Sequence, residues 1–99
     1  MKIHWTTLAD LTFRDEIDFI LRKWNAEEAM KFVDLVEAFE KALASNPFMG
    51  KPSEKRQIRM FVLSKQTTVF HEVFEEKNRI DIQLFWNNTK DPKGLEIYL

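Results

Sequence analysis

The sequence of 99 residues has no cysteine, only two histidines, two glycines and three prolines. Without cysteine the chain can form no disulfide framework, thiolate nucleophile or cysteine-ligated zinc site. The two histidines stand far apart, so we expect no metal site. The sequence also lacks a phosphate-binding P-loop, a dinucleotide-binding glycine fingerprint and a nucleophile elbow, and we expect no cofactor. These absences exclude the common thiol, metal and nucleotide-dependent enzyme classes.

Long apolar runs are absent as well. No stretch approaches the ~20 apolar residues that a membrane span requires, and residues 1–7 contain no apolar signal core. We therefore expect no membrane association and a cytoplasmic location. The net charge of −1 gives no global attraction to nucleic acid, although the charge is uneven along the chain. Residues 1–50 hold six basic and nine acidic residues, whereas residues 51–99 hold nine basic and seven acidic ones.

Apolar and aromatic residues, by contrast, are plentiful. They make up 44% and 13% of the chain, which is typical of a folded globular protein. A chain of 99 residues has room for one hydrophobic core, so we predict a single domain over residues 1–99.

The first half of the chain predicts one strand followed by two helices. Residues 2–6 alternate between apolar and polar side chains, as a short strand does. Thr7 is predicted to cap the first helix, with Asp10 in its first turn, and Asn25 to end that helix and cap the next one. Apolar residues then recur every three or four positions. They are Ala9, Phe13, Ile17, Ile20, Leu21 and Trp24, and then Ala29, Phe32, Val33, Val36, Phe39 and Leu43. The short link between the helices predicts an antiparallel helical hairpin.

In the second half the apolar period changes to two. Segments beginning at Arg56, Thr67 and Arg79 alternate, and polar turns separate them, which predicts a three-stranded antiparallel meander. In the last strand, four residues are predicted to share one face: Ile80, Ile82, Leu84 and Trp86. The predicted fold is therefore α+β, with an N-terminal strand, a helical hairpin and a meander, and with the helices packed on one face of an antiparallel sheet.

This layout resembles the RelE/ParE toxin superfamily of bacterial type II toxin–antitoxin systems over essentially the whole chain. Its landmarks are Trp5-Thr6, Asn46-Pro47-Phe48-Met49-Gly50, Ile58-Arg59, and the segment Leu84-Phe85-Trp86-Asn87-Asn88-Thr89-Lys90-Asp91-Pro92-Lys93-Gly94-Leu95. The last landmark is the most specific, because relatives known as plasmid stabilisation proteins often end their last strand in a similar way. One position departs from the pattern, since Thr89 stands where relatives often have arginine.

The resemblance implies a ParE-like toxin that binds a cellular target such as gyrase or the ribosome. It also implies a cognate antitoxin whose C-terminal segment is disordered until it wraps the toxin, and a homodimer or a heterotetramer with that antitoxin. Two alternatives stay open. One is a ribosome-dependent messenger-RNA endonuclease of the RelE type, and the other is a protein-binding remnant of the family without toxicity.

The residues available for a nuclease form an incomplete set, which favours a toxin that is not an enzyme. RNA cleavage needs a base, an acid and a charge that stabilises the phosphate. The basic candidates are Lys55, Arg56, Arg59 and Lys65. Nuclease relatives often have arginine at the positions of Thr67, Thr68 and Thr89. His71 is expected to lie on the core side of its strand, next to Val69 and Val73, and so to be structural.

Two surfaces are predicted to make contacts. The end of the last strand and the basic residues of the meander are candidates for contacting the cellular target: Arg56, Arg59, Lys65, Asn87, Asn88, Thr89 and Lys90. The three tryptophans, Trp5, Trp24 and Trp86, either pack in the core or line a groove for the antitoxin.

Overall fold

The computed structural model describes residues 1–54 and 57–95. Within them the elements follow in the order β1 (Lys2–Trp5), α1 (Thr7–Lys23), α2 (Ala26–Ser45), β2 (Lys51–Pro52), β3 (Ile58–Val62), β4 (Thr67–Phe74), a short 3-10 helix η1 (Glu75–Lys77), β5 (Arg79–Asn87) and α3 (Pro92–Leu95). The predicted order of strand, two helices and three strands is confirmed. The two-residue strand β2 and the single-turn helix α3 were not predicted, because each is too short to show a periodicity.

Both long helices begin at a side-chain cap. Asn25 caps α2 as predicted, and its Oδ1 accepts a hydrogen bond from the Glu28 backbone N–H at 2.9 Å. The cap of α1, however, is Thr6 and not Thr7, since the Thr6 hydroxyl oxygen accepts from the Ala9 N–H at 3.0 Å. Thr6 still has an extended backbone, which a capping residue needs. Its hydroxyl also donates to the Gln83 carbonyl at 3.0 Å, so the start of α1 is fixed to β5.

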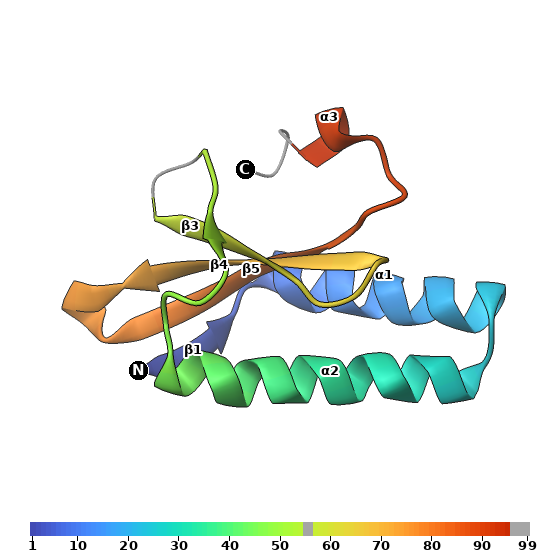
Figure 1. Ribbon diagram of the computed structural model, residues 1–99, viewed down its shortest axis with the longest axis horizontal. Helices are drawn as coiled ribbons and strands as arrows, with labels where there is room; N and C mark the ends of the chain where they lie inside the picture. Colours follow the sequence, from blue (N-terminus) through green and yellow to red (C-terminus); the bar gives the residue numbers. More distant parts are fainter. Residues whose placement is uncertain (55–56, 96–99) are drawn as a thin grey trace.

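The five strands form one sheet in the order β1-β5-β4-β3-β2. The meander of β3, β4 and β5 is antiparallel, as predicted. β1 pairs with β5 in parallel, with Ile3 opposite Ile80, so the sheet is mixed and not antiparallel throughout. The helical hairpin explains this direction, because two antiparallel helices return the chain to the end of the sheet where β1 began (Figure 1).

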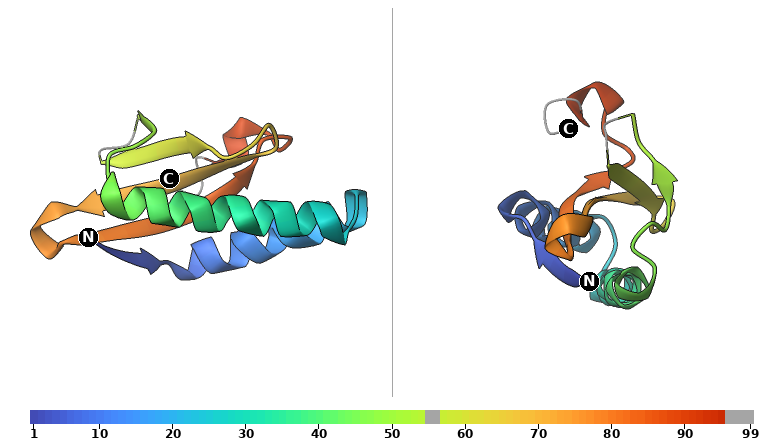
Figure 2. Two further views of the ribbon diagram at one scale, coloured as in Figure 1. Left: turned by 60° about the horizontal axis from the view of Figure 1, so that its bottom comes forward. Right: turned by 90° about the vertical axis from the view of Figure 1, so that its left-hand side faces the viewer.

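The two long helices lie side by side on one face of the sheet, and α3 lies on the other face (Figures 1 and 2). Between helices and sheet is the main core, which includes Phe32, Phe39, Leu43, Ile82 and Phe85. A smaller apolar cluster of Phe70, Leu84 and Trp86 lies on the opposite face, where Leu95 of α3 packs against it. No helix in the described part of the chain is long and apolar enough to cross a membrane.

The last strand contains a β-bulge that reverses part of the predicted side-chain pattern. His71 lies opposite Ile82 and Phe70 lies opposite Leu84, so Gln83 is an extra residue in β5. Ile80 and Ile82 consequently face the helices, whereas Leu84 and Trp86 face the other way. The prediction that these four residues share one face is therefore wrong, because one inserted residue inverts every side chain after it.

Candidate functional site

Two chain segments meet at the end of the sheet where β5 finishes and the β3–β4 turn lies. Asn88 joins them, since its backbone N–H donates to the Gln66 carbonyl at 2.6 Å and its Nδ2 donates to the Lys65 carbonyl at 3.1 Å. The Thr68 hydroxyl donates to Asn88 Oδ1 at 2.8 Å. We call the surface formed by Lys65, Asn87, Asn88, Thr89 and Lys90 the polar end. The hydrogen bonds of Asn88 hold the end of β5 and the β3–β4 turn in a fixed relative position.

Asn87 organises the chain beyond β5. It is 2% exposed, and its Oδ1 accepts from both the backbone N–H and the hydroxyl of Thr89, at 2.9 and 2.5 Å. This is the side-chain to backbone turn that asparagine favours. Thr89 and Lys90 are exposed, and the Lys90 ammonium lies 5.7 Å from the centre of the Trp86 ring. The polar end thus presents lysine, amide and hydroxyl groups.

Arg59 lies away from the polar end and binds backbone carbonyls of a loop. Its Nε and Nη2 donate to the carbonyls of Met49 and Gly50, at 3.4 and 3.1 Å, and its guanidinium lies 5.9 Å from the centre of the Phe48 ring. Arg59 therefore fixes the loop between α2 and β2. Lys55 and Arg56 fall outside the described residues. Of the two predicted nuclease residues that the structure describes, Lys65 lies at the polar end and Arg59 does not.

His71 is fully buried on the helix side of β4, as predicted. It is 0% exposed, its Nε2 lies 2.9 Å from the Pro47 carbonyl, and its ring packs 5.9 Å from that of Phe39. No described residue bonds to its Nδ1. Burial lowers the pKa of His71 below 6.5, and the nearby positive charge of Arg59 lowers it further, while the hydrogen bond to Pro47 opposes the shift. The imidazole is therefore neutral and acts as a structural donor.

This lowered pKa predicts a stability that falls in mild acid. Because the folded state disfavours the imidazolium, the contribution of His71 is fully present above its unfolded pKa of about 6.5 and is lost as the pH falls below it. We expect the free energy of unfolding to drop by up to about 1.4 kcal/mol per pH unit below that point. Urea unfolding at pH 7.5, 6.5 and 5.5 measures this slope.

The matched variant is His71→Gln, whose amide can still donate to Pro47 but does not titrate. Its stability should change less between pH 7.5 and 5.5 than that of the natural chain. An equal slope in both proteins would show that other groups cause the acid sensitivity. The other histidine, His4, is exposed, and its Nδ1 lies 3.3 Å from Asp81 Oδ1. It is present in both proteins, so its effect on stability cancels when the two slopes are compared.

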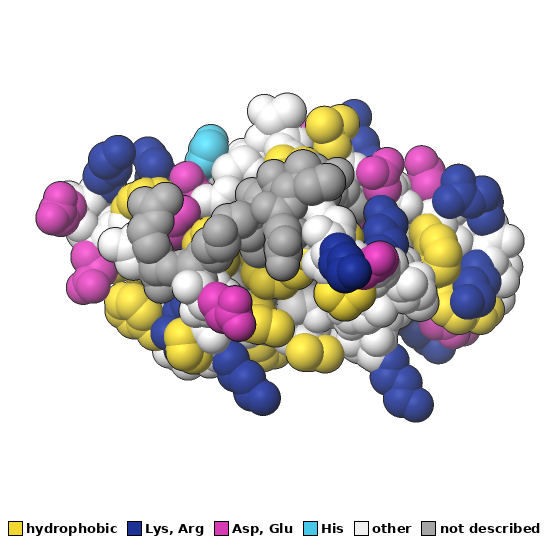
Figure 3. Space-filling view, turned by 90° about the horizontal axis from the view of Figure 1, so that it is seen from above, with side chains coloured by type: hydrophobic (Ala, Val, Ile, Leu, Met, Phe, Trp, Pro, Cys, Tyr) yellow, Lys and Arg dark blue, Asp and Glu magenta, His cyan; other side chains and the backbone are white. Residues whose placement is uncertain are grey.

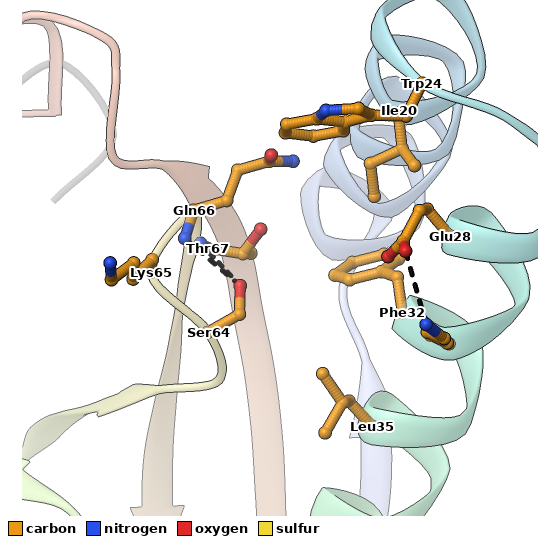
Figure 4. Close-up of a pocket in the computed structure, with 10 residues that line it drawn as sticks. Ile20, Trp24, Glu28, Phe32, Leu35, Ser64, Lys65, Gln66 and Thr67 are labelled. Atoms are coloured by element: carbon orange, nitrogen blue, oxygen red, sulfur yellow. Dashed lines mark hydrogen bonds and ion pairs between the residues drawn. The ribbon is translucent and has the colours of Figure 1, made fainter.

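An apolar groove adjoins the polar end on its helix side. Its cavity of about 360 Å³ lies between the two helices and the β3–β4 turn. Ile20, Trp24, Phe32 and Leu35 form its apolar walls, and Figure 4 shows Gln66 extending toward the Trp24 ring while Lys65 turns away from the helices. Trp24 and Leu35 are 50% and 43% exposed, so the groove presents two large apolar side chains to solvent. We call this feature the Trp24 groove.

The other two tryptophans pack against other side chains, Trp5 half-buried and Trp86 buried. Trp5 lies against Phe13 and Phe85, with ring centres 5.1 and 5.2 Å apart, and its Nε1 donates to Glu40 at 2.9 Å. Trp86 is 8% exposed and belongs to the small cluster under α3. Of the three, only Trp24 presents much of its ring to solvent. Sequence alone could not separate them, because all three continue an apolar pattern, although Trp24 is the residue that directly follows α1.

Charged side chains on the face that carries α3 are mixed in sign. In the part that Figure 3 draws in colour, basic and acidic groups alternate around the periphery and do not gather into one positive field. A nucleic-acid surface usually shows such a field.

Comparison with known proteins identifies the family of this chain. Residues 3–91 match the family described as the ParE toxin of the type II toxin–antitoxin system parDE. The fold is similar to a solved structure of the chromosomal ParDE toxin–antitoxin system from P. aeruginosa, with a TM-score of 0.73 and 23% sequence identity. That likeness covers 88% of this chain and 95% of the other. No curated protein matches the sequence. Because the family match covers most of the chain, this protein belongs to the ParE toxin family of type II toxin–antitoxin systems.

Proposed function

We propose that this protein is a toxin that arrests growth by binding a cellular target and that a cognate antitoxin neutralises it. The family match supports the toxin class. The target surface that we propose is the polar end, and its candidate contacts are Lys65, Asn88, Thr89 and Lys90. We place the protein and its target in the cytoplasm.

The observation that carries a binding mechanism is the chemistry of the polar end. Its amides and hydroxyls donate and accept hydrogen bonds but are poor acids and bases. Its lysines supply positive charge, whereas the imidazole of His71 on the neighbouring strand is fully buried and cannot reach a bound RNA. Such a surface fits recognition of a partner better than cleavage of RNA. Gyrase and the ribosome are both candidate targets.

The Trp24 groove supports the proposal of an antitoxin partner. It combines a half-exposed indole, the buried side chains of Ile20 and Phe32, and residues of the β3–β4 turn. Amphipathic segments that fold on binding use such grooves, placing apolar anchors in the pocket. The groove adjoins the polar end through the β3–β4 turn, so a chain bound there could also cover the target surface.

Inducible expression of the chain tests this proposal in cells. Alone, it should stop growth, and co-expression with the neighbouring small reading frame should restore it. The double variant Lys65→Glu, Lys90→Glu should lose toxicity. Both lysines are exposed, and the two substitutions reverse the charge of the proposed target surface. A matched control is Lys41→Glu, on an exposed position of α2 away from the polar end. Harmless expression of the natural chain without its partner would instead identify a non-toxic member of the family.

A further inference from the structure

The chain beyond β5 folds back over the sheet through two successive hydrogen-bonded turns. The Lys90 N–H donates to the Asn87 carbonyl at 3.0 Å, and the Gly94 N–H donates to the Asp91 carbonyl at 3.0 Å. Asp91 Oδ1 also accepts from the Lys93 N–H at 3.0 Å, which fixes the start of α3. These turns bring α3 to the face opposite the long helices, where it meets the smaller apolar cluster (Figure 1).

Gly94 brings α3 into direct contact with the indole of Trp86. A β-carbon at residue 94 would lie 3.3 Å from Trp86 Cη2, which is closer than ordinary van der Waals contact. Gly50 is the described glycine with a positive φ, so the backbone of Gly94 is open to other residues. The missing side chain of Gly94 therefore serves the close approach of α3 to the ring. Trp86 is 8% exposed, and the packing around it fixes the position of its ring.

The same ring lies against the ammonium group of Lys90. Lys90 Nζ is 5.7 Å from the ring centre, within the ~6 Å range of a cation–π interaction. The acidic residues Asp15, Glu16 and Asp18 line a cavity that Lys90 also lines. In the described part of the chain, however, none of them forms an ion pair with the lysine. Among the described residues, the indole is therefore the group that holds the ammonium.

We propose that Trp86 is a positioning residue of the polar end and holds the Lys90 ammonium in place for contact with the cellular target. A free lysine side chain loses rotamer freedom when a partner immobilises it, and this loss weakens binding. A lysine that is already held over a rigid ring has less freedom to lose. Because Trp86 is buried, it acts through Lys90 and does not touch the target itself. The inference rests on the proposed function, in which Lys90 is a target contact.

Proton NMR of the natural full-length chain tests this arrangement without any target. The ring current of an indole moves protons above its face upfield. The ε-CH₂ protons of Lys90, assigned by their loss in Lys90→Arg, should therefore lie upfield of those of Lys41, an exposed lysine of α2. Trp86→Phe keeps an aromatic face and should keep the difference, whereas Trp86→Leu should abolish it. Equal positions for Lys90 and Lys41 in the natural chain would overturn the proposal.

A double-mutant cycle in the growth assay separates positioning from a merely structural role. Lys90→Gln and Trp86→Leu should each raise the amount of soluble chain needed for arrest roughly tenfold. If Trp86 acts through Lys90, the double variant should need no more chain than either single variant. Trp86→Phe, the conservative replacement, should stay within roughly threefold of the natural chain. Quantitative immunoblots of the soluble fraction correct each value for loss of folded protein.

The outcomes distinguish this inference from the proposed function. Multiplied effects in the double variant would show that Trp86 acts through stability alone and would overturn the positioning role. Full toxicity of Lys90→Gln would remove Lys90 from the target contacts and overturn only this inference. Harmless expression of the natural chain would instead overturn the proposed function itself. Since the NMR comparison of Lys90 with Lys41 uses the natural chain, a poorly folded Trp86→Leu variant does not affect it.

Discussion

Replacing Phe85 by alanine is expected to unfold the protein or to leave it barely folded at 25 °C. Phe85 is 2% exposed, and its ring centre lies 5.2 Å from that of Trp5, 5.6 Å from that of Phe13 and 6.3 Å from that of Phe32. It thereby joins β1, both long helices and β5. Removing a buried phenylalanine costs about 3–5 kcal/mol, a large share of the ~5–15 kcal/mol that stabilises a typical domain.

Urea unfolding followed by tryptophan fluorescence measures this loss. Phe48→Ala is the matched control, because Phe48 is 47% exposed and lies outside the main core. We expect Phe48→Ala to lower the free energy of unfolding by less than about 1 kcal/mol, so its urea midpoint should move little. Similar midpoints for the two variants would mean that the aromatic cluster does not hold helices and sheet together.

The second large effect is expected at Trp24. Within the proposed function, Trp24→Ala should weaken antitoxin binding by about 2–4 kcal/mol, or roughly 30- to 1000-fold in Kd. The indole is half exposed and forms one wall of the Trp24 groove, so it can bury a large apolar surface against a partner. Isothermal titration with the purified antitoxin gives the change in Kd.

Met30→Ala is a suitable control for Trp24→Ala. Met30 is 68% exposed on α2 and does not line the Trp24 groove, so its removal should change Kd less than threefold. Growth assays offer a second readout, since Trp24→Ala should remain toxic but escape the antitoxin. Unchanged affinity in Trp24→Ala would place the antitoxin on another surface.

The parts of the fold that sequence predicts are those written in local patterns. The apolar stripe of α2 and its Asn25 cap, and the alternation in β4, follow from residues close together in the chain. The Thr6 cap was misplaced by one residue because two threonines are adjacent. Only pairing with Ile82 and Gln83 keeps Thr6 extended and so selects it as the cap.

What sequence could not predict depends on distant pairing. The parallel contact of β1 with β5 joins residues more than seventy positions apart, and nothing within β1 encodes the direction. The bulge at Gln83 is set by the register with β4, since the alternation of β5 looks regular on its own. A residue as polar as Glu16 gives no sign of burial until Thr67 is placed beside it.

In the candidate site, too, some features were predictable from local sequence and others were not. Its location at the end of β5 was predicted from the cluster of polar residues after Trp86, and the β3–β4 turn brings Lys65 to it through Asn88. Arg59 was grouped with these residues because it is basic, yet its partners are loop carbonyls. Charge alone does not distinguish a residue that binds a target from one that holds a loop.

Incubation of the purified chain with ribosomes translating a defined messenger RNA tests the central claim most directly. We predict intact messenger RNA at chain concentrations that arrest growth in cells, because the proposed mechanism is binding. Primer extension would reveal any cut, and a supercoiling assay with purified gyrase in parallel would reveal inhibition of that target. Cleavage of the messenger RNA on the ribosome by the chain alone would contradict the binding mechanism and identify a nuclease.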